Sequence, residues 1–279
     1  MKTAGGMRRL SALLAVAAAC LAAAESGIGQ EQKAGPLAGA ADRQLSERIS
    51  TFYKTPDPKE VPGLLSQWSV SPSAQRREGI PPMVGFAAGL AAKYPDRIDA
   101  MFPPSLSPKA QAVAVAGVRI AGQGQKAQSL ARSYGWPDDK VEAAGRGGNI
   151  REVRVASADD LDILWGASFA AGDAFYVHKI LTFYAEFAKR PDVAVDDLVS
   201  IVKFVHGQRV HGQRQGGDLK WVVQKYGEAR AREFVVAAAA LWALDSNSRQ
   251  HAFVRQLVDQ FLAEQAGSLA AKGLLGLRS

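Results

Sequence analysis

Residues 161–181 read LDILWGASFAAGDAFYVHKIL, and this stretch decides the fold. Its apolar side chains recur at the three- and four-residue intervals of an α-helix on both sides of Gly172-Asp173. A two-residue turn forces the helices that flank it to be adjacent and antiparallel, so the stretch predicts an αα-hairpin. The apolar positions are Leu161, Leu164, Trp165, Val177, Ile180 and Leu181.

Two further turns divide the chain in the same way. Gly122-Gln123-Gly124 and Ser246-Asn247-Ser248 each lie between apolar stripes of helical spacing. Only residues 150–155, IREVRV, look extended. We therefore expect an all-α protein of stacked antiparallel helical hairpins, arranged as an irregular α-solenoid or as a helical bundle. Helices are expected to begin near residues 81, 108, 159, 174 and 196.

The last two hairpins align without a gap at an offset of 77 residues. Leu164 then falls on Leu241 and Trp165 on Trp242, which favours two copies of one packing unit. The second interpretation is that any two amphipathic hairpins share an apolar register. Both interpretations stay open from the sequence.

The N-terminus has the pattern of an export signal. Lys2, Arg8 and Arg9 form a positively charged start, and an apolar run from Leu10 to Ala24 follows and ends in small residues. This run is shorter than the ~20 residues that a membrane-spanning helix needs. We expect residues 1–24 to be a cleaved signal peptide, and the mature chain to be periplasmic or secreted and to have no transmembrane segment.

Cys20 offers a second interpretation of the same segment. Ala17-Ala18-Ala19 precedes it, as small residues precede a lipid-modified cysteine, but Leu is the usual residue at the first of these positions. A lipid anchor at Cys20 is therefore the weaker alternative. Cleavage after Ala24 would leave a mature chain without cysteine, and hence without a disulfide or a thiolate ligand.

Composition divides the rest of the chain into three parts. Residues 25–41 lack periodicity and predict a flexible tether, residues 42–266 predict the helical domain, and residues 267–279 predict a flexible tail. Without the three basic residues of the signal, 31 basic residues face 27 acidic ones, a net charge of +4 in place of +7. This mild excess does not predict nucleic-acid binding, which needs a clustered basic face.

Two segments resemble a known group of proteins. Residues 161–177 are similar to the LDxLWxxFxATGDxxYV segment of exported proteobacterial all-helical proteins, with Ala171 in place of the usual Thr. Residues 241–251 are similar to a later segment of the same proteins, and the resemblance covers roughly residues 50–265. It implies a helical fold and export. Because the group has no assigned activity, the resemblance implies no functional residues.

Residues 122–127, GQGQKA, imitate the glycine turn of a dinucleotide-binding fold, in which backbone N–H groups bind a pyrophosphate. The apolar stretch before them, residues 112–121, is longer than one strand needs, and no alternating βαβ pattern follows. Export would also separate the protein from the nicotinamide pool. We therefore interpret the string as a turn between two helices and expect no cofactor.

Residues 206–214 contain HGQR twice. Histidines that share a metal on a helix need a spacing of three or four, whereas His206 and His211 are about 140° apart around a helix, and no Asp, Glu or Cys stands nearby. We expect no metal site. The stretch from Lys203 to Arg232 carries seven Lys and Arg against two acids, which indicates a solvated basic face or one that meets an acidic partner or anionic lipid.

Three acid pairs, Asp138-Asp139, Asp159-Asp160 and Asp196-Asp197, stand where helices are expected to begin. A carboxylate near the N-terminal end of a helix interacts favourably with the positive end of the helix dipole. We therefore interpret the pairs as helix caps and not as acid–base pairs. The sequence contains no G-x-S-x-G, H-E-x-x-H or Walker motif, and we assign no catalytic residue.

The large aromatic residues on the apolar stripes are expected in the core. The alternative is a groove between hairpins that presents one or two of them to a peptide or ligand. The residues are Trp165, Tyr176, Tyr184 and Trp242.

These features favour a binding or scaffold protein of the bacterial cell envelope, with a protein or peptide partner of unidentified kind. The alternative is an envelope enzyme with a helical active site that carries no known motif. The sequence assigns no ligand-binding residue.

Overall fold

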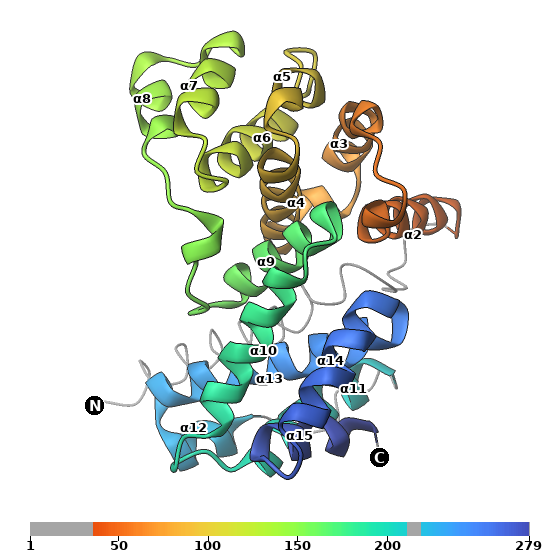
Figure 1. The fold of residues 1–279 in the computed structure, drawn as a ribbon, viewed down its shortest axis with the longest axis vertical. Helices are drawn as coiled ribbons and strands as arrows, with labels where there is room; N and C mark the ends of the chain where they lie inside the picture. The colour runs from red at the N-terminus through yellow and green to blue at the C-terminus, as the bar shows by residue number, and fades with distance from the viewer. Residues whose placement is uncertain (1–35, 211–218, 279) are drawn as a thin grey trace, which may run out of the picture. The chain divides into compact units, whose positions relative to one another are not determined.

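The computed structural model describes residues 36–210 and 219–278, and the all-α fold class is confirmed (Figure 1). The described residues contain fourteen α-helices and short 3-10 segments, and they show no β-strand beyond an isolated bridge between Ala121 and Asn149. The predicted signal peptide with Cys20, and the tether up to residue 35, lie outside the described residues. The α-helices are α2 (Pro36–Ser50), α3 (Val61–Val70), α4 (Ile80–Lys93), α5 (Ile98–Met101), α6 (Pro108–Ile120), α7 (Gly124–Ser133), α8 (Asp138–Gly145), α9 (Ala158–Ala171), α10 (Ala174–Ala188), α11 (Val195–Val210), α12 (Lys220–Tyr226), α13 (Glu228–Gln250), α14 (Ala252–Glu264) and α15 (Leu269–Arg278).

The described chain forms two compact units. The N-terminal unit comprises residues 36–154 and 159–177, and the C-terminal unit comprises residues 155–158 together with the described residues from 178 onward. The boundary falls inside α10, between Val177 and His178. Residues of the helical domain expected over 42–266 belong to both units, and its bounds stay a prediction.

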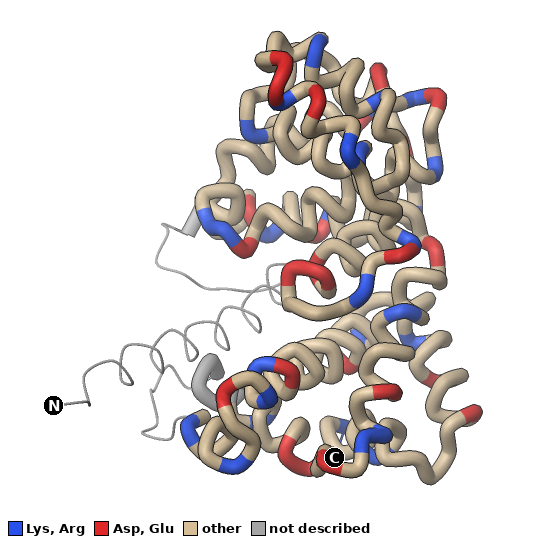
Figure 2. Tube along the Cα trace, turned by 90° about the vertical axis from the view of Figure 1, so that its left-hand side faces the viewer, with Lys and Arg blue, Asp and Glu red and all other residues tan. Residues whose placement is uncertain are grey.

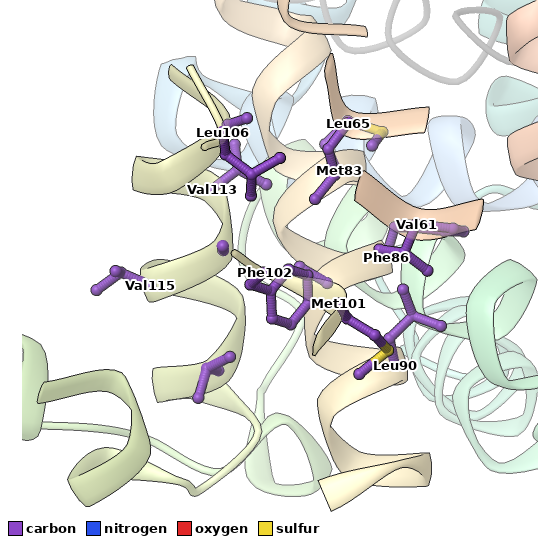
Figure 3. Close-up of a cluster of buried hydrophobic side chains, with 14 of the residues drawn as sticks. Val61, Leu65, Met83, Phe86, Leu90, Met101, Phe102, Leu106, Val113 and Val115 are labelled. Carbon is purple, nitrogen blue, oxygen red and sulfur yellow. The ribbon is translucent and has the colours of Figure 1, made fainter. Parts of the chain in front are cut away.

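The core of the N-terminal unit lies around α4 and α6, which pack along each other (Figure 3). Met83, Phe86 and Leu90 recur at helical spacing on α4, and all three are buried. Met101 lies next to Leu90 in the same cluster. Burial of each such side chain contributes about 1.5–3 kcal/mol, so the apolar stripe that predicts α4 also organises this unit.

Glycine allows α4 and α9 to approach closely. A Cβ added to Gly85 would lie 2.0 Å from the carbonyl oxygen of Ile163, and one added to Gly166 would lie 1.9 Å from the carbonyl oxygen of Pro82. The two helices therefore meet through their backbones, and only glycine fits at these two positions. This contact fixes α9, which carries the candidate site described below, against the core of the N-terminal unit.

The C-terminal unit is built around α13, whose middle from Phe234 to Leu241 is buried. Helices α11, α12, α14 and α15 pack against α13. The last helix also meets α10 closely, because the Tyr184 hydroxyl donates a hydrogen bond to the Ala270 carbonyl at 3.0 Å. Gly273 of α15 permits this contact, since a Cβ there would lie 2.1 Å from the Tyr184 hydroxyl oxygen.

The predicted turns at Gly122 and Gly172 are confirmed. Gly122 has a φ of 82° between α6 and α7, and Gly172 has a φ of 64° between α9 and α10. Both values lie in the left-handed region that glycine adopts without strain. Ser107 also begins α6 as predicted, because its side chain accepts a hydrogen bond from the Ala110 N–H.

The predicted turn at Ser246-Asn247-Ser248 is wrong. These residues continue α13 to Gln250, and the chain turns at His251, whose backbone is extended with φ −121° and ψ 114°. Two contacts favour the helix over the turn. Asp245 pairs with Arg249 one turn later at 2.9 Å, and the Ser248 hydroxyl donates to the Asp245 carbonyl at 2.7 Å.

The extended segment expected at residues 150–155 is also wrong. Ile150–Glu152 form a 3-10 segment that Asn149 begins, since its side chain accepts a hydrogen bond from the Arg151 N–H at 2.9 Å. Ile150 is buried, whereas Val153 and Val155 are only partly so. The apolar pattern of residues 150–155 therefore reflects one buried side chain, that of Ile150, in an irregular connection between α8 and α9.

Both segments expected to be flexible contain helix. Pro36 opens α2, so residues 36–41 of the predicted tether are helical, with proline in the first turn, where its missing N–H costs no helical hydrogen bond. The predicted tail contains α15, which begins where the Ser268 hydroxyl accepts a hydrogen bond from the Ala271 N–H at 3.1 Å. Leu274 of α15 is fully buried, so the Gly- and Leu-rich stretch that the composition marks as a tail packs against the fold through this side chain.

The proposed repeat at an offset of 77 residues stays a prediction. Leu164 and Leu241 are both fully buried, but Trp165 is buried while Trp242 is only half-buried. The helix ends of the two hairpins also do not align. Gly172-Asp173 lies between α9 and α10, whereas residues 249 and 250, which align with it at the offset of 77, belong to α13.

Candidate functional site

The acid pairs lie in first helical turns, as predicted, and the three pairs differ in the contacts that their side chains make. At α8 the residue before the helix is Pro137, which makes no side-chain cap hydrogen bond, and Asp138 and Asp139 stand in the first turn, where a negative charge interacts favourably with the helix dipole. At α9, Asp159 forms an exposed ion pair with Arg77 at 3.8 Å. Exposed pairs of this kind contribute little to stability.

Asp197 of the third pair ties α11 to α12. Its Oδ2 accepts hydrogen bonds from the Lys225 ammonium, at 2.7 Å, and from the Tyr226 hydroxyl. The hydrogen bond to Asp197 raises the pKa of Lys225, and burial followed by the bond to Asp197 raises the pKa of Tyr226. Both partners thus hold their protons more firmly, and the Tyr226 ring stacks on Phe234 at 4.0 Å, as suits a structural contact.

The basic stretch of residues 203–232 is partly neutralised within the fold. Arg230 pairs with Asp192 and Glu233, and Arg232 pairs with Glu228 at 2.7 Å. Figure 2 accordingly shows Lys and Arg interspersed with Asp and Glu along the described trace. The side chains of the HGQR copies, residues 206–214, lie outside the described side chains.

The glycine string at residues 122–127 connects two helices, as the sequence favours, because α6 precedes it and α7 begins at Gly124. A Cβ on Gly124 would lie 2.6 Å from the carbonyl oxygen of Gly145. Packing of α7 against α8 therefore accounts for glycine at this position.

Asp173 begins α10 with its side chain. Its Oδ1 accepts a hydrogen bond from the Phe175 N–H at 2.9 Å, and its Oδ2 pairs with Arg151 at 2.9 Å. The Arg151 guanidinium also lies 4.6 Å from the centre of the Phe175 ring. These contacts give the Gly172-Asp173 segment a structural role.

Three polar side chains on α9 form the candidate site, which we call the α9 polar row: Asp162, Trp165 and Ser168. They stand one helical turn apart, and their side chains are 4%, 4% and 0% exposed. The Asp162 Oδ2, the Trp165 Nε1 and the Ser168 Oγ are each buried without a hydrogen-bond partner. Buried polar atoms are nearly always paired, so three such atoms on two turns of one helix call for an explanation.

Asp162 is the ionisable member of the row. Burial, and then the charges of Asp159 and Glu78, raise the pKa of Asp162 well above its ordinary value. All three causes disfavour the carboxylate, so the fold favours the protonated acid. A protonated Asp162 can donate a hydrogen bond, as the Trp165 N–H and the Ser168 hydroxyl also can.

The framework around the α9 polar row is tightly held. Trp165 stacks on Phe169 with ring centres 5.8 Å apart and planes inclined by 25°. The Lys93 ammonium donates a hydrogen bond to the Ala171 carbonyl at 2.6 Å, which satisfies the C-terminal end of α9. Together with the glycine contact to α4, these interactions fix the register of the helix that carries the row.

Sequence reasoning placed Trp165 in the core, and its burial confirms this, as it does for Tyr176 and Tyr184. It overlooked Asp162 and Ser168. The available signal was an acid inside an apolar stripe, since Asp162 stands between Leu161 and Leu164. An acid in such a position is seldom fully buried without a reason.

Among the described side chains, no group of three or more His, Cys, Asp or Glu is arranged to hold a metal ion. Comparison of the chain with models of protein families, with curated proteins and with solved structures gave no match. The α9 polar row is therefore interpreted from its own chemistry.

Proposed function

We propose that this chain is an exported helical binding or scaffold protein of the bacterial cell envelope. The observation that carries the binding role is the α9 polar row. The row holds three buried polar atoms without hydrogen-bond partners, and buried polar atoms of this kind are nearly always paired, so a bound molecule would supply partners that the fold does not. We propose a protein or peptide partner as well, without assigning residues to it.

Two features of the sequence, at residues 1–24 and 161–177, support the location. The first 24 residues have the charge and apolar pattern of an export signal. Among the helices of the described residues, none has both the length and the apolar character to cross a membrane. The similarity of residues 161–177 to exported proteobacterial proteins supports the same proposal.

A specific observation favours the alternative of an envelope enzyme. Asp162 has the raised pKa of a general acid, and the carboxylates of Asp159 and Glu78 stand near it. A nucleophile would in addition need a base within hydrogen-bond reach, and the buried Ser168 hydroxyl has no such partner. The binding role therefore accounts for more of the row than catalysis does.

The location is tested by expressing the full chain with a C-terminal tag, fractionating the cells and determining the mature N-terminus by mass spectrometry. We expect an envelope or external fraction with Glu25 as the first residue. A Cys20→Ser variant should show the same location and N-terminus. A cytosolic product that retains Met1 contradicts export, and a Cys20→Ser variant that loses its location favours the lipid anchor.

Binding is tested on protein purified from the envelope fraction, by comparing its native and denatured masses. We expect the native mass to include a bound molecule that is absent from a Ser168→Ala variant. Equal native and denatured masses, together with no partner cross-linked in the envelope, would contradict the binding role.

A further inference from the structure

We propose that the first turns of α9 form a pH-sensitive switch, which stays packed against α4 in acid and detaches locally as the pH rises. The switch segment is residues 159–165, all of which belong to the N-terminal unit. The inference concerns contacts inside this unit, so it does not rest on the proposed binding function or on the proposed location.

The packed state of the switch segment leaves polar atoms without partners. The segment contains Asp162 and Trp165 of the α9 polar row, and each buries one polar atom that has no hydrogen-bond partner. Detachment would expose both atoms to water and satisfy them. This gain offsets part of the apolar packing that detachment loses, so the segment is closer to opening than a fully satisfied helix would be.

Asp162 makes the balance depend on pH. The charges that act on it are those of Asp159 in the same segment and of Glu78 in the 3-10 segment before α4. The cation nearby is Arg77, which pairs with Asp159, and α4 carries one charged side chain, Lys93, at its C-terminal end. Among the described residues Asp162 has no ion pair of its own, so its carboxylate would face negative charge without compensation.

Close packing prevents a gradual adjustment to this charge. A Cβ on Gly85 would lie 2.0 Å from the carbonyl oxygen of Ile163, the residue after Asp162, so the backbones of α4 and the switch segment are in contact there. A carboxylate at Asp162 therefore reaches water only when the segment leaves α4. Opening then releases a proton, and it becomes more favourable as the pH rises.

The two ends of α9 are held unequally. At the N-terminal end, the ion pair between Arg77 and Asp159 is exposed and spans 3.8 Å. At the C-terminal end, the Lys93 ammonium donates a hydrogen bond of 2.6 Å to the Ala171 carbonyl. Exposed ion pairs contribute little to stability, so we expect α9 to detach from its N-terminal end while its last turn stays packed.

The inference is tested by amide hydrogen exchange of the full mature chain between pH 4.5 and pH 7.5, corrected for the intrinsic rate of each amide. We expect residues 162–165 to be less protected than α6 at every pH. Their opening constant should rise by up to about tenfold per pH unit. The rise ends at the folded-state pKa of Asp162, which burial and then Asp159 and Glu78 hold above its ordinary value.

Three variants assign the pH dependence to Asp162. Asp162→Asn has no proton to release, so the opening constant of residues 162–165 should not change with pH. Glu78→Gln removes one of the two negative charges, so the rise should end at a lower pH than in the parent. The matched control is Asp138→Asn on α8, an exposed position, which should follow the parent.

The inference fails if residues 162–165 and α6 are equally protected at every pH, because the segment then opens only when the whole unit unfolds. It also fails if the opening constant of the parent does not change with pH, or if it rises as steeply in Asp162→Asn. Should Asp162→Asn not fold, the Glu78→Gln variant decides the question, and a profile identical to that of the parent overturns the switch.

Discussion

At the scale of single residues, Asp162 shows how the environment of one carboxyl group affects the whole protein. Its folded-state pKa is raised by burial and by Asp159 and Glu78, whereas in the unfolded chain the group returns to about 3.9. Below pH ~3.9 the acid is protonated in both states, and its burial carries no charge penalty. As the pH rises from there toward the folded-state pKa, only the unfolded state ionises, and stability is lost.

Asp162→Asn should remove this loss. The variant has no proton to release, so its free energy of unfolding relative to the parent should rise between pH 4.5 and pH 7.5, by about 1.4 kcal/mol for each pKa unit of the shift within that window. Urea unfolding at several pH values measures the difference. Asp138→Asn, at an exposed position, is the control. A constant difference between Asp162→Asn and the parent would show that Asp162 is ionised in the folded protein.

Replacement by alanine is expected to change stability in opposite directions at two glycines. Gly166 lies at the close contact between α4 and α9, and Gly63 lies in α3, away from any close contact. Gly166→Ala should destabilise the protein by about 1–3 kcal/mol, because the new Cβ would overlap the Pro82 carbonyl oxygen. Gly63→Ala should be neutral or stabilise it by up to about 1 kcal/mol, because Gly63 lies within α3 with open space around it. Denaturant unfolding compares them. Equal effects would mean that helix propensity, and not close packing, decides both positions.

Single residues also show why part of the site escapes prediction from sequence. Burial of Trp165 follows from its place on the apolar stripe. The raised pKa of Asp162 depends first on its burial and then on the charges of Asp159 and Glu78, and Glu78 belongs to a 3-10 segment that the helix periodicity does not reveal. The need for glycine at position 166 depends on Pro82, a contact that only the tertiary fold creates.

At the scale of elements, apolar periodicity predicts the helices well and their ends less well. The stripes that predict α4, α6 and α9 are all helical, and the caps and glycines that begin or end them lie as expected. The turn at Ser246-Asn247-Ser248 fails because polar residues can also continue a helix when their side chains bond within it, as Asp245 and Arg249 do. Turn residues therefore indicate a helix end only where such bonds are lacking.

Helix α15 provides a direct test of the corrected C-terminus. Leu274→Ala should cost about 2–5 kcal/mol, because the side chain is fully buried against the C-terminal unit. Leu275→Ala, its neighbour, should change stability by less than about 0.5 kcal/mol, because Leu275 is 53% exposed. Thermal and urea unfolding distinguish the two. In a flexible tail both substitutions would be equally harmless, and that result would contradict the helix.

At the scale of the whole molecule, the division into two units predicts where a local defect is felt. Gly166→Ala should speed amide hydrogen exchange mainly in α4 and α6, and Leu274→Ala mainly in α11 and α13, because each substitution disturbs contacts inside one unit. Exchange followed by mass spectrometry of peptides locates the change. If either substitution speeds exchange equally in both units, the molecule opens as one cooperative body.

The hydrogen bond from Lys93 to the Ala171 carbonyl has a consequence for biosynthesis, because it joins residues 78 positions apart. At 5–20 residues per second, a ribosome needs roughly 4–16 s to reach the second partner after making the first. During that interval α4 has no α9 to pack against, and the N-terminal unit cannot close. A chain kept open for seconds in this way would suit the proposed export, in which an unfolded chain is threaded through a secretion pore.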